Sequence, residues 1–187
     1  MEPLILTLDR AGLPSDWVEI EEAITYHARG AVVYSLGEFV CEYRGGIQRD
    51  GRRSRIETRS ILAIRGLHAK AHEPSRAPGV ANRLLFARDR HLCAYCGARF
   101  LTRDLSCDHV VPASKGGKHH WMNVVTACRT CNTRKADRTP EQARMALRYV
   151  PYVPNRYEHF ILRNRNILAD QMEYLLAGVP RGSRLHA

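Results

Sequence analysis

Hydrophobic and polar positions in the first third of the chain predict one helix followed by several strands. The stretch LPSDWVEIEEAITYHARG, residues 13–30, combines apolar positions with an acidic exposed side, as in an amphipathic helix. Asp16 is the expected N-cap, Glu19 lies three residues later, and Gly30 marks the end of the helix. From Ala31 onward, AVVYSLGEFVCEYRGG and SRIETRSILAIRG are rich in β-branched and aromatic residues. We therefore expect a helix and then three or four antiparallel strands.

A cluster of arginines lies between the two strand segments, in GIQRDGRRSR. The Asp-Gly pair at residues 50–51 is typical of a tight hairpin turn. The cluster has two interpretations: a solvated hairpin tip, which we favour, or a contact with backbone phosphate. Its members are Arg49, Arg52, Arg53 and Arg55.

Turn-forming residues divide the rest of the chain. The segment KAHEPSRAPGV, residues 70–80, concentrates Pro, Gly, Ser and charge, so we place the main boundary there and expect a β-rich domain over 1–80 and a second unit over 81–143. A helical extension over 144–187 follows, with one helix opened by Asn155 and another ending near Gly178. Both helices should pack on the body, because their apolar faces would otherwise be exposed.

The charge of the chain points to a polyanionic partner. Its 187 residues include 29 Lys+Arg against 19 Asp+Glu, a net charge of +10, and the pI is near 9.7. Residues 1–50 hold nine of the acidic and four of the basic residues, so the positive charge is concentrated after residue 50. Nucleic acid is the first candidate partner, and an anionic membrane surface is the second.

Nothing in the sequence favours a membrane protein. No apolar stretch approaches the roughly 20 residues that a spanning helix needs. The start, MEPLILTLDR, is acidic and does not resemble a signal peptide. A basic amphipathic helix with an aromatic face is also lacking, so we set membrane-surface binding aside and expect a soluble, cytoplasmic protein.

Four of the six cysteines form two CxxC pairs that are separated by 31 residues: Cys93, Cys96, Cys128 and Cys131. Two such pairs supply the tetrahedral set of soft ligands that Zn²⁺ prefers in closed structural sites. Disulfides or a redox CxxC are the alternative, which is disfavoured because neither pair lies in a thioredoxin-like setting. Four sulfurs leave no open position on the ion, so this zinc should stabilise structure and perform no hydrolysis.

Between the cysteine pairs, LSCDHVVPASKGG places Asp108 beside His109 at the start of a Gly-rich loop. Asn123 follows this loop, and Asn132 comes directly after the last cysteine. An isolated Asp-His pair would by default be an ordinary surface pair. Here it stands in register with the cysteine pairs, which favours a catalytic interpretation.

The order CxxC, Asp-His, Lys-Gly-Gly loop, Asn and CxxC-Asn resembles the zinc-bearing branch of the HNH endonucleases. The resemblance covers residues 81–143. It implies a ββα-metal fold, in which two strands, a loop and a helix hold one catalytic divalent ion. We therefore expect an α+β protein: an N-terminal helix plus a small antiparallel sheet, then a zinc-stapled ββα-metal unit, then C-terminal helices.

The resemblance also implies a role for each motif residue. His109 would be the general base, Asp108 and Asn132 would bind the catalytic ion, and Asn123 would hold the loop that orients the histidine. Asn132 stands where the family name has its second histidine, a variant that the family uses. The implied ions are a structural Zn²⁺ and a catalytic Mg²⁺ or Mn²⁺.

The chemistry of these residues agrees with that assignment. Phosphodiester hydrolysis requires a base for the attacking water and a cation at the scissile phosphate. Histidine titrates near neutral pH, and carboxylate and amide oxygens are hard donors suited to Mg²⁺ or Mn²⁺. Neighbouring residues of a regular strand point to opposite faces, so we expect the strand to end or bend at Asp108 and His109.

Basic residues on either side of the motif should form a phosphate-binding rim, for which a merely solvated basic face is the alternative. They are Lys115, Lys118, Arg129, Arg134, Lys135 and Arg138. His119 and His120 could also contact phosphate, but we favour solvated loop residues.

These observations lead to a metal-dependent endonuclease that acts on DNA. The alternative is a non-catalytic, zinc-stabilised nucleic-acid-binding module, in which the same basic groups hold the backbone. One active site cuts one strand, so double-strand cleavage would require a homodimer or sequential nicking.

Overall fold

The computed structural model describes residues 2–47, 49, 51–66 and 79–186. The chain divides into two compact units, which we call the sheet unit and the cysteine unit. The sheet unit comprises Met1–Arg76 and Arg156–Gly178, and the cysteine unit comprises Ala77–Asn155 and Val179–Ala187. The stretch after residue 143 is therefore shared between the two units, whereas the sequence led us to three consecutive domains. Most of the expected boundary at 70–80 lies outside the described residues.

The sheet unit contains four strands in the order β2-β1-β4-β3. These are β1 (Ile5–Leu8), β2 (Pro14–Val18), β3 (Val32–Ile47) and β4 (Arg53–Ile64). β1 pairs antiparallel with β2 but parallel with β4, so the sheet is mixed and the prediction of an antiparallel sheet was wrong. The parallel pair arises because the short ILTL segment enters the centre of the sheet, where both of its faces are buried.

The predicted first helix begins later than expected. α1 spans Ile20–Ala28, and Glu19 is its N-cap without a side-chain capping bond. Asp16 lies in β2 instead, where its backbone N–H and carbonyl both bond the Thr7 hydroxyl at 3.0 Å. This pairing of β1 with β2 outweighs the local capping preference of Asp16. The end of the helix was predicted correctly, because Gly30 follows it with a φ of 62°.

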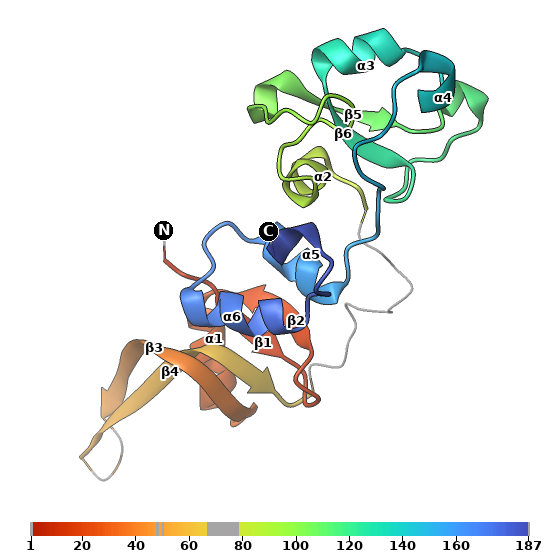
Figure 1. Cartoon of the computed structure of the whole chain (residues 1–187). Coiled ribbons are helices and arrows are strands. Elements are labelled where there is room, and N and C mark those ends of the chain that lie inside the picture. Colours follow the sequence, from red (N-terminus) through yellow and green to blue (C-terminus); the bar gives the residue numbers. More distant parts are fainter. Residues whose placement is uncertain (1, 48, 50, 67–78, 187) are drawn as a thin grey trace. The chain divides into compact units, whose positions relative to one another are not determined.

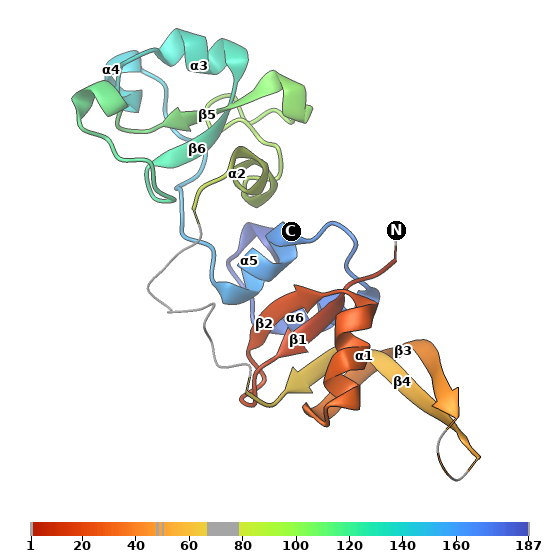
Figure 2. The ribbon, with the colours of Figure 1, turned by 180° about the vertical axis from the view of Figure 1, so that it is seen from behind.

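Helices cover both faces of the sheet, as Figures 1 and 2 show from opposite sides. On one face, α5 (Arg156–Arg163) and α6 (Ala169–Ala177) pack through Phe160 and Leu175 against the central strands. On the other face, α1 packs through Ala23. Both C-terminal helices were predicted, as was their packing against the body.

The distal part of the β3–β4 hairpin extends away from the rest of the sheet unit (Figures 1 and 2). β1 pairs with β4 only over residues 61–63, whereas β3 pairs with β4 as far as Arg53. The outer half of the hairpin is therefore a two-stranded ribbon. Asp50 of the predicted turn lies outside the described residues, and Gly51 has a φ of 80°.

The cysteine unit contains a small antiparallel hairpin and the helix that follows it. β5 (Leu105–His109) and β6 (Val124–Cys128) pair without a register shift, and α3 (Arg129–Lys135) begins directly after β6. This is the predicted order of two strands and a helix. The short helices α2 (Asn82–Arg88) and α4 (Pro140–Ala143) flank it. No helix within the described ranges has the length and apolarity needed to cross a membrane.

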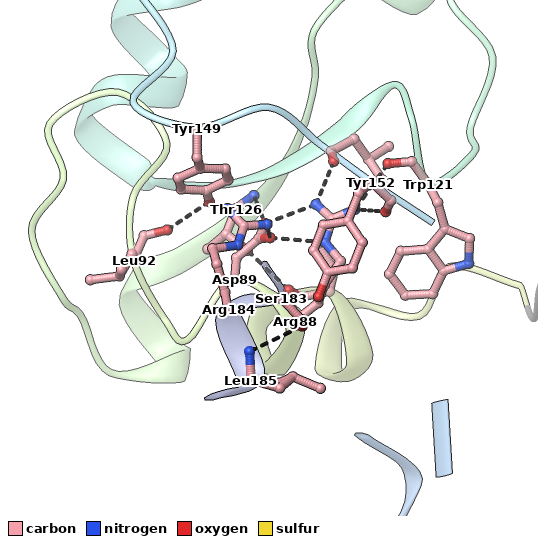
Figure 3. A network of polar contacts seen from close by, with 12 residues as sticks. Arg88, Asp89, Leu92, Trp121, Thr126, Tyr149, Tyr152, Ser183, Arg184 and Leu185 are labelled. Carbon is pink, nitrogen blue, oxygen red and sulfur yellow. Dashed lines mark hydrogen bonds and ion pairs between the residues drawn. The ribbon is translucent and has the colours of Figure 1, made fainter. Parts of the chain in front are cut away.

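A buried network of charges joins distant segments of the cysteine unit (Figure 3). Arg88 is fully buried and pairs with Asp89 at 2.8 Å, and it donates to the backbone carbonyls of Trp121, Val124 and Tyr152. Asp89 also accepts from Arg184 at 2.9 Å. Residues 179–186 are thereby attached to α2 and β6.

Candidate active site

The four CxxC cysteines come together in the cysteine unit. Their sulfur atoms all lie within 4.8 Å of one another, and among the described residues they are the group that could hold a metal ion. Tetrahedral Zn²⁺ with Zn–S bonds of about 2.3 Å places its sulfurs about 3.8 Å apart. The set of four soft donors at this spacing fits a structural Zn²⁺.

Backbone N–H groups favour the thiolate form of Cys93, whereas burial raises the pKa of Cys96 and Cys131. Burial raises the pKa of the Cys93 thiol, but N–H groups of Cys96, Cys128 and Tyr95 donate to its sulfur and lower the pKa to about 7. The N–H of Cys131 likewise lies 3.4 Å from the sulfur of Cys128. Thiolates are the form that binds metal.

Asp108, in β5, is buried between two donors. The Lys135 ammonium lies 2.9 Å from Oδ1, and the Tyr95 hydroxyl donates to Oδ2. Burial, followed by this hydrogen bond, raises the pKa of Tyr95, so the hydroxyl keeps its proton. Both carboxylate oxygens of Asp108 are therefore engaged by neighbouring side chains.

Lys135 does not lie on the predicted phosphate-binding rim. Its side chain is fully buried, and its ammonium donates to the Asp108 carboxylate and, at 2.8 Å, to the His109 carbonyl. The prediction failed because this position of α3 faces the hairpin, where the ammonium finds a carboxylate. The other predicted rim residues are exposed: Lys115, Lys118, Arg129, Arg134 and Arg138.

His109 and His119 form a pair at the end of β5. His109 Nε2 lies 3.1 Å from His119 Nδ1, and the ring centroids are 5.2 Å apart. His119 Nε2 lies 3.1 Å from the carbonyl oxygen of Val80. His119 is exposed, as expected for the loop, but it contacts the candidate base and is more than a solvated residue.

Asp108 and His109 contact different partners but share one pocket. β5 ends at His109, as predicted, and pairs regularly through Asp108 with Val125 and His109 with Val124. The adjacent side chains thus leave opposite faces of the strand. A pocket of about 340 Å³ is nevertheless lined by both residues. Its other lining residues are Cys107, Pro112, Ala113, Ser114, Asn132, Lys135, Ala136 and Asp137.

Asn123 holds the loop between the hairpin strands. Its amide oxygen accepts from the Val111 N–H at 2.9 Å, and its amide nitrogen donates to the carbonyls of Val111 and Lys118 at 3.0 Å. The loop also needs Gly117, because a Cβ there would lie 1.8 Å from the Val111 oxygen. These bonds join Asn123 to Val111 and Lys118, within the loop that the resemblance expects it to hold.

Asn132 lies on α3 at the edge of the same pocket, next to Cys131. Its amide nitrogen donates to the Ser106 hydroxyl at 2.9 Å, so only its amide oxygen is available as a ligand. That oxygen and the Asp108 carboxylate are hard donors, which fit Mg²⁺ or Mn²⁺. Each carboxylate oxygen has two lone pairs, so Asp108 can accept one hydrogen bond at an oxygen and still bind a cation.

Comparison with known protein families agrees with this geometry. Residues 93–148 match the family described as HNH endonuclease. This segment is an HNH endonuclease domain. A search among curated proteins found no significant match to the chain. The match begins at Cys93 and ends at residue 148, so it overlaps most of the 81–143 segment that the sequence indicated.

Sequence reasoning did not anticipate the contacts that three side chains make in the HNH domain: Tyr95, His119 and Lys135. Lys135 follows Asn132 by three residues in a helix, a spacing that places both on one face. That spacing could have indicated a shared site. Tyr95 lies between two zinc cysteines, but nothing in its local sequence indicates that its hydroxyl reaches Asp108.

Proposed function

We propose that the chain is a metal-dependent endonuclease that hydrolyses DNA phosphodiester bonds, with His109 as the general base. One Mg²⁺ or Mn²⁺ would be held by Asp108 and Asn132. The pocket shared by these three residues, within an HNH domain, is the observation that supports this proposal most directly. Five exposed cations of the predicted rim add a surface that suits phosphate.

The hydrogen bonds of His119 determine which nitrogen of His109 acts as the base. The Val80 carbonyl can only accept, so His119 donates to it from Nε2. In a neutral ring, His119 Nδ1 then carries no proton, so it accepts a hydrogen bond from the N–H at His109 Nε2. The lone pair of His109 therefore resides on Nδ1, and Nδ1 takes the proton of the attacking water.

The surroundings of His109 keep it in the basic form at neutral pH. Burial lowers the pKa of His109, the Lys135 ammonium acts in the same direction, and the Asp108 carboxylate opposes them. The neutral imidazole is then the major form at pH 7 and is lost only as the pH falls through this lowered pKa. A neutral imidazole can accept the proton of the attacking water, as a general base must.

The ion pair of Lys135 with Asp108 lies next to the proposed base, His109. The buried ammonium ties the Asp108 carboxylate to the His109 carbonyl and so fixes the end of β5. A divalent ion bound at Asp108 and Asn132 would neutralise charge on the scissile phosphate and on the leaving oxygen.

A non-catalytic nucleic-acid-binding module is the second candidate. The ion pair of Asp108 with Lys135 favours it, because a carboxylate that an ammonium already neutralises does not require a metal ion. The exposed rim would bind DNA equally well in such a module.

Plasmid nicking separates the two candidates. We expect the wild type to nick DNA with Mg²⁺ or Mn²⁺ and His109→Ala to lose activity by about 10²–10⁴-fold, the range for a general base. His120→Ala removes the neighbouring exposed imidazole and should nick as the wild type does. A wild type that binds DNA but never nicks it would favour the binding module, and an equally active His109→Ala would exclude His109 as the base.

A further inference from the structure

The outer half of the β3–β4 hairpin is a surface for which the HNH domain gives no explanation. Over residues 43–47 and 53–56 it consists of two strands that pair only with each other among the described residues (Figures 1 and 2). The exposed side chain of Ile47, at 72% of its full area, lies near its end. A ribbon of this kind makes little contribution to a core, so its composition is free to serve another purpose.

The charge of the chain reverses at this ribbon. Residues 1–42 contain eight acidic and two basic residues, whereas residues 43–56 contain five arginines and one aspartate. The described arginines of the ribbon are all exposed. A strongly basic projection on an otherwise acidic segment indicates an anionic ligand more than a general need for solubility.

The register brings two of these arginines directly opposite each other. Arg44 pairs with Arg55 across the strands, and like charges in that position destabilise a hairpin. One carboxylate, Glu42, lies 2.6 Å from both guanidinium groups, which remain 64% and 60% exposed. A single acid therefore orients two arginines without covering them.

We propose that the β3–β4 ribbon is a second DNA contact, in which Arg44, Arg53 and Arg55 bind backbone phosphates of double-stranded DNA. This inference rests on the proposed function, because it assigns the same substrate to a second site. A two-stranded ribbon fits the major groove, whose walls are phosphates, and arginine binds phosphate in a bidentate manner. The sequence favoured a solvated tip, but it did not show the isolation of the ribbon or the opposed arginines.

The test compares two charge-matched variants of the full chain. The ribbon variant carries Arg44→Gln, Arg53→Gln and Arg55→Gln. The control carries Arg10→Gln, Arg29→Gln and Arg65→Gln, which remove three exposed arginines elsewhere in the sheet unit. Affinity for a labelled duplex is measured by fluorescence anisotropy against salt, without added divalent ions. Circular dichroism verifies that both variants are folded.

We expect the slope of log affinity against log salt to decrease by about 2 to 3 for the ribbon variant, since each phosphate contact contributes about 0.9. The control should keep the slope of the wild type. An unchanged slope in the ribbon variant overturns the inference, and so does an equal decrease in both variants, because net charge alone would then explain binding.

Plasmid nicking by the same proteins separates this inference from the proposed function. If the ribbon variant loses binding while the wild type never nicks, the result supports the DNA contact and contradicts the nuclease proposal. If the wild type nicks while the ribbon variant keeps the wild-type slope of log affinity against log salt, the result supports the nuclease proposal and contradicts the DNA contact. A wild type that does not bind the duplex overturns the contact directly.

Discussion

The two units of the chain use different interactions in their interiors. The centre of the sheet unit is apolar and contains Ile5, Leu6, Leu62 and other aliphatic side chains of β1 and β4. The cysteine unit also buries charged side chains, namely Arg88, Asp89, Asp108 and Lys135, together with Cys93 and Cys128 of the cysteine cluster. Two strands of five residues each bury little apolar surface, so the cysteine cluster and the polar cross-links add to the interior of that unit.

This difference concerns function as well as stability. Buried ion pairs contribute little net stability, because desolvation offsets their attraction, but breaking one is costly. Such pairs hold side chains in fixed positions, and the pocket lined by Asp108 and His109 lies in the cysteine unit. The sheet unit buries polar side chains too, such as Glu158 and Gln171, but its central strands pack mainly through aliphatic residues.

Removal of zinc should produce the largest separation between the units. We expect a strong chelator to unfold the cysteine unit and leave the sheet unit folded, because structural zinc contributes on the order of 10 kcal/mol. Trp121 reports on the cysteine unit and Trp17 on the sheet unit, so single-tryptophan variants can follow each by fluorescence. Simultaneous changes at both tryptophans would show that the units unfold as one.

Asp89→Ala should be the most damaging substitution at the buried network. It leaves the fully buried Arg88 without its carboxylate, at a cost of about 3–5 kcal/mol. Leu62→Ala is the counterpart in the sheet unit and should cost about 2–5 kcal/mol through a cavity. In urea unfolding, Asp89→Ala should lower the stability reported by Trp121, and Leu62→Ala should lower the stability reported by Trp17. A loss from Asp89→Ala at Trp17 alone would contradict the assignment.

Lys135→Met tests whether Asp108 is structural or binds a cation. We expect a loss of about 2–3 kcal/mol, less than for Asp89→Ala, because the pocket brings Asp108 close to solvent. If Asp108 is an ion ligand, added Mg²⁺ should raise the melting temperature of this variant more than that of the wild type. Lys118→Met, at an exposed position, is the control for stability. Equal responses of Lys135→Met and the wild type would argue against an ion at Asp108.

His119 variants test the hydrogen bond to the base. His119→Ala should lower the nicking rate about tenfold, or about 1.4 kcal/mol, without affecting stability, because His109 loses the acceptor that fixes its tautomer. His119→Asn keeps an acceptor near the Nδ1 position and should restore most of the rate. Nitrogen NMR should place the His109 proton on Nε2 in the wild type and in His119→Asn. A proton on Nδ1 in the wild type would refute the assignment.

Ala136→Gly should have the smallest effect, and it should be stabilising. Ala136 has φ 54° and ψ −137°, a conformation that glycine adopts far more readily. Removal of the Cβ should therefore add about 1 kcal/mol, measured by urea unfolding through Trp121. A destabilised Ala136→Gly would show that the side chain is needed where it lines the pocket.

The sequence predicted those parts of the site that depend on short spacings. The two CxxC pairs come together as expected because each is a compact motif, whereas the roles of Asp108, His109 and Asn123 stay predictions. Lys135 was misplaced, because a lysine that pairs with a buried carboxylate has the same local sequence as an exposed one. β1 was missed for a related reason: a four-residue segment buried on both faces shows no alternation, and only its partners define it as a strand.

The path of the chain limits how this protein can be divided. Synthesis makes the first part of the sheet unit, then most of the cysteine unit, then the two helices that finish the sheet unit, and only afterwards Arg184, which completes the network around Asp89. Each unit is built from two separate segments of the chain, so no single continuous segment contains a complete unit. Asp89 is made 95 residues before Arg184, so the network around Asp89 can be completed only after both C-terminal helices have been synthesised.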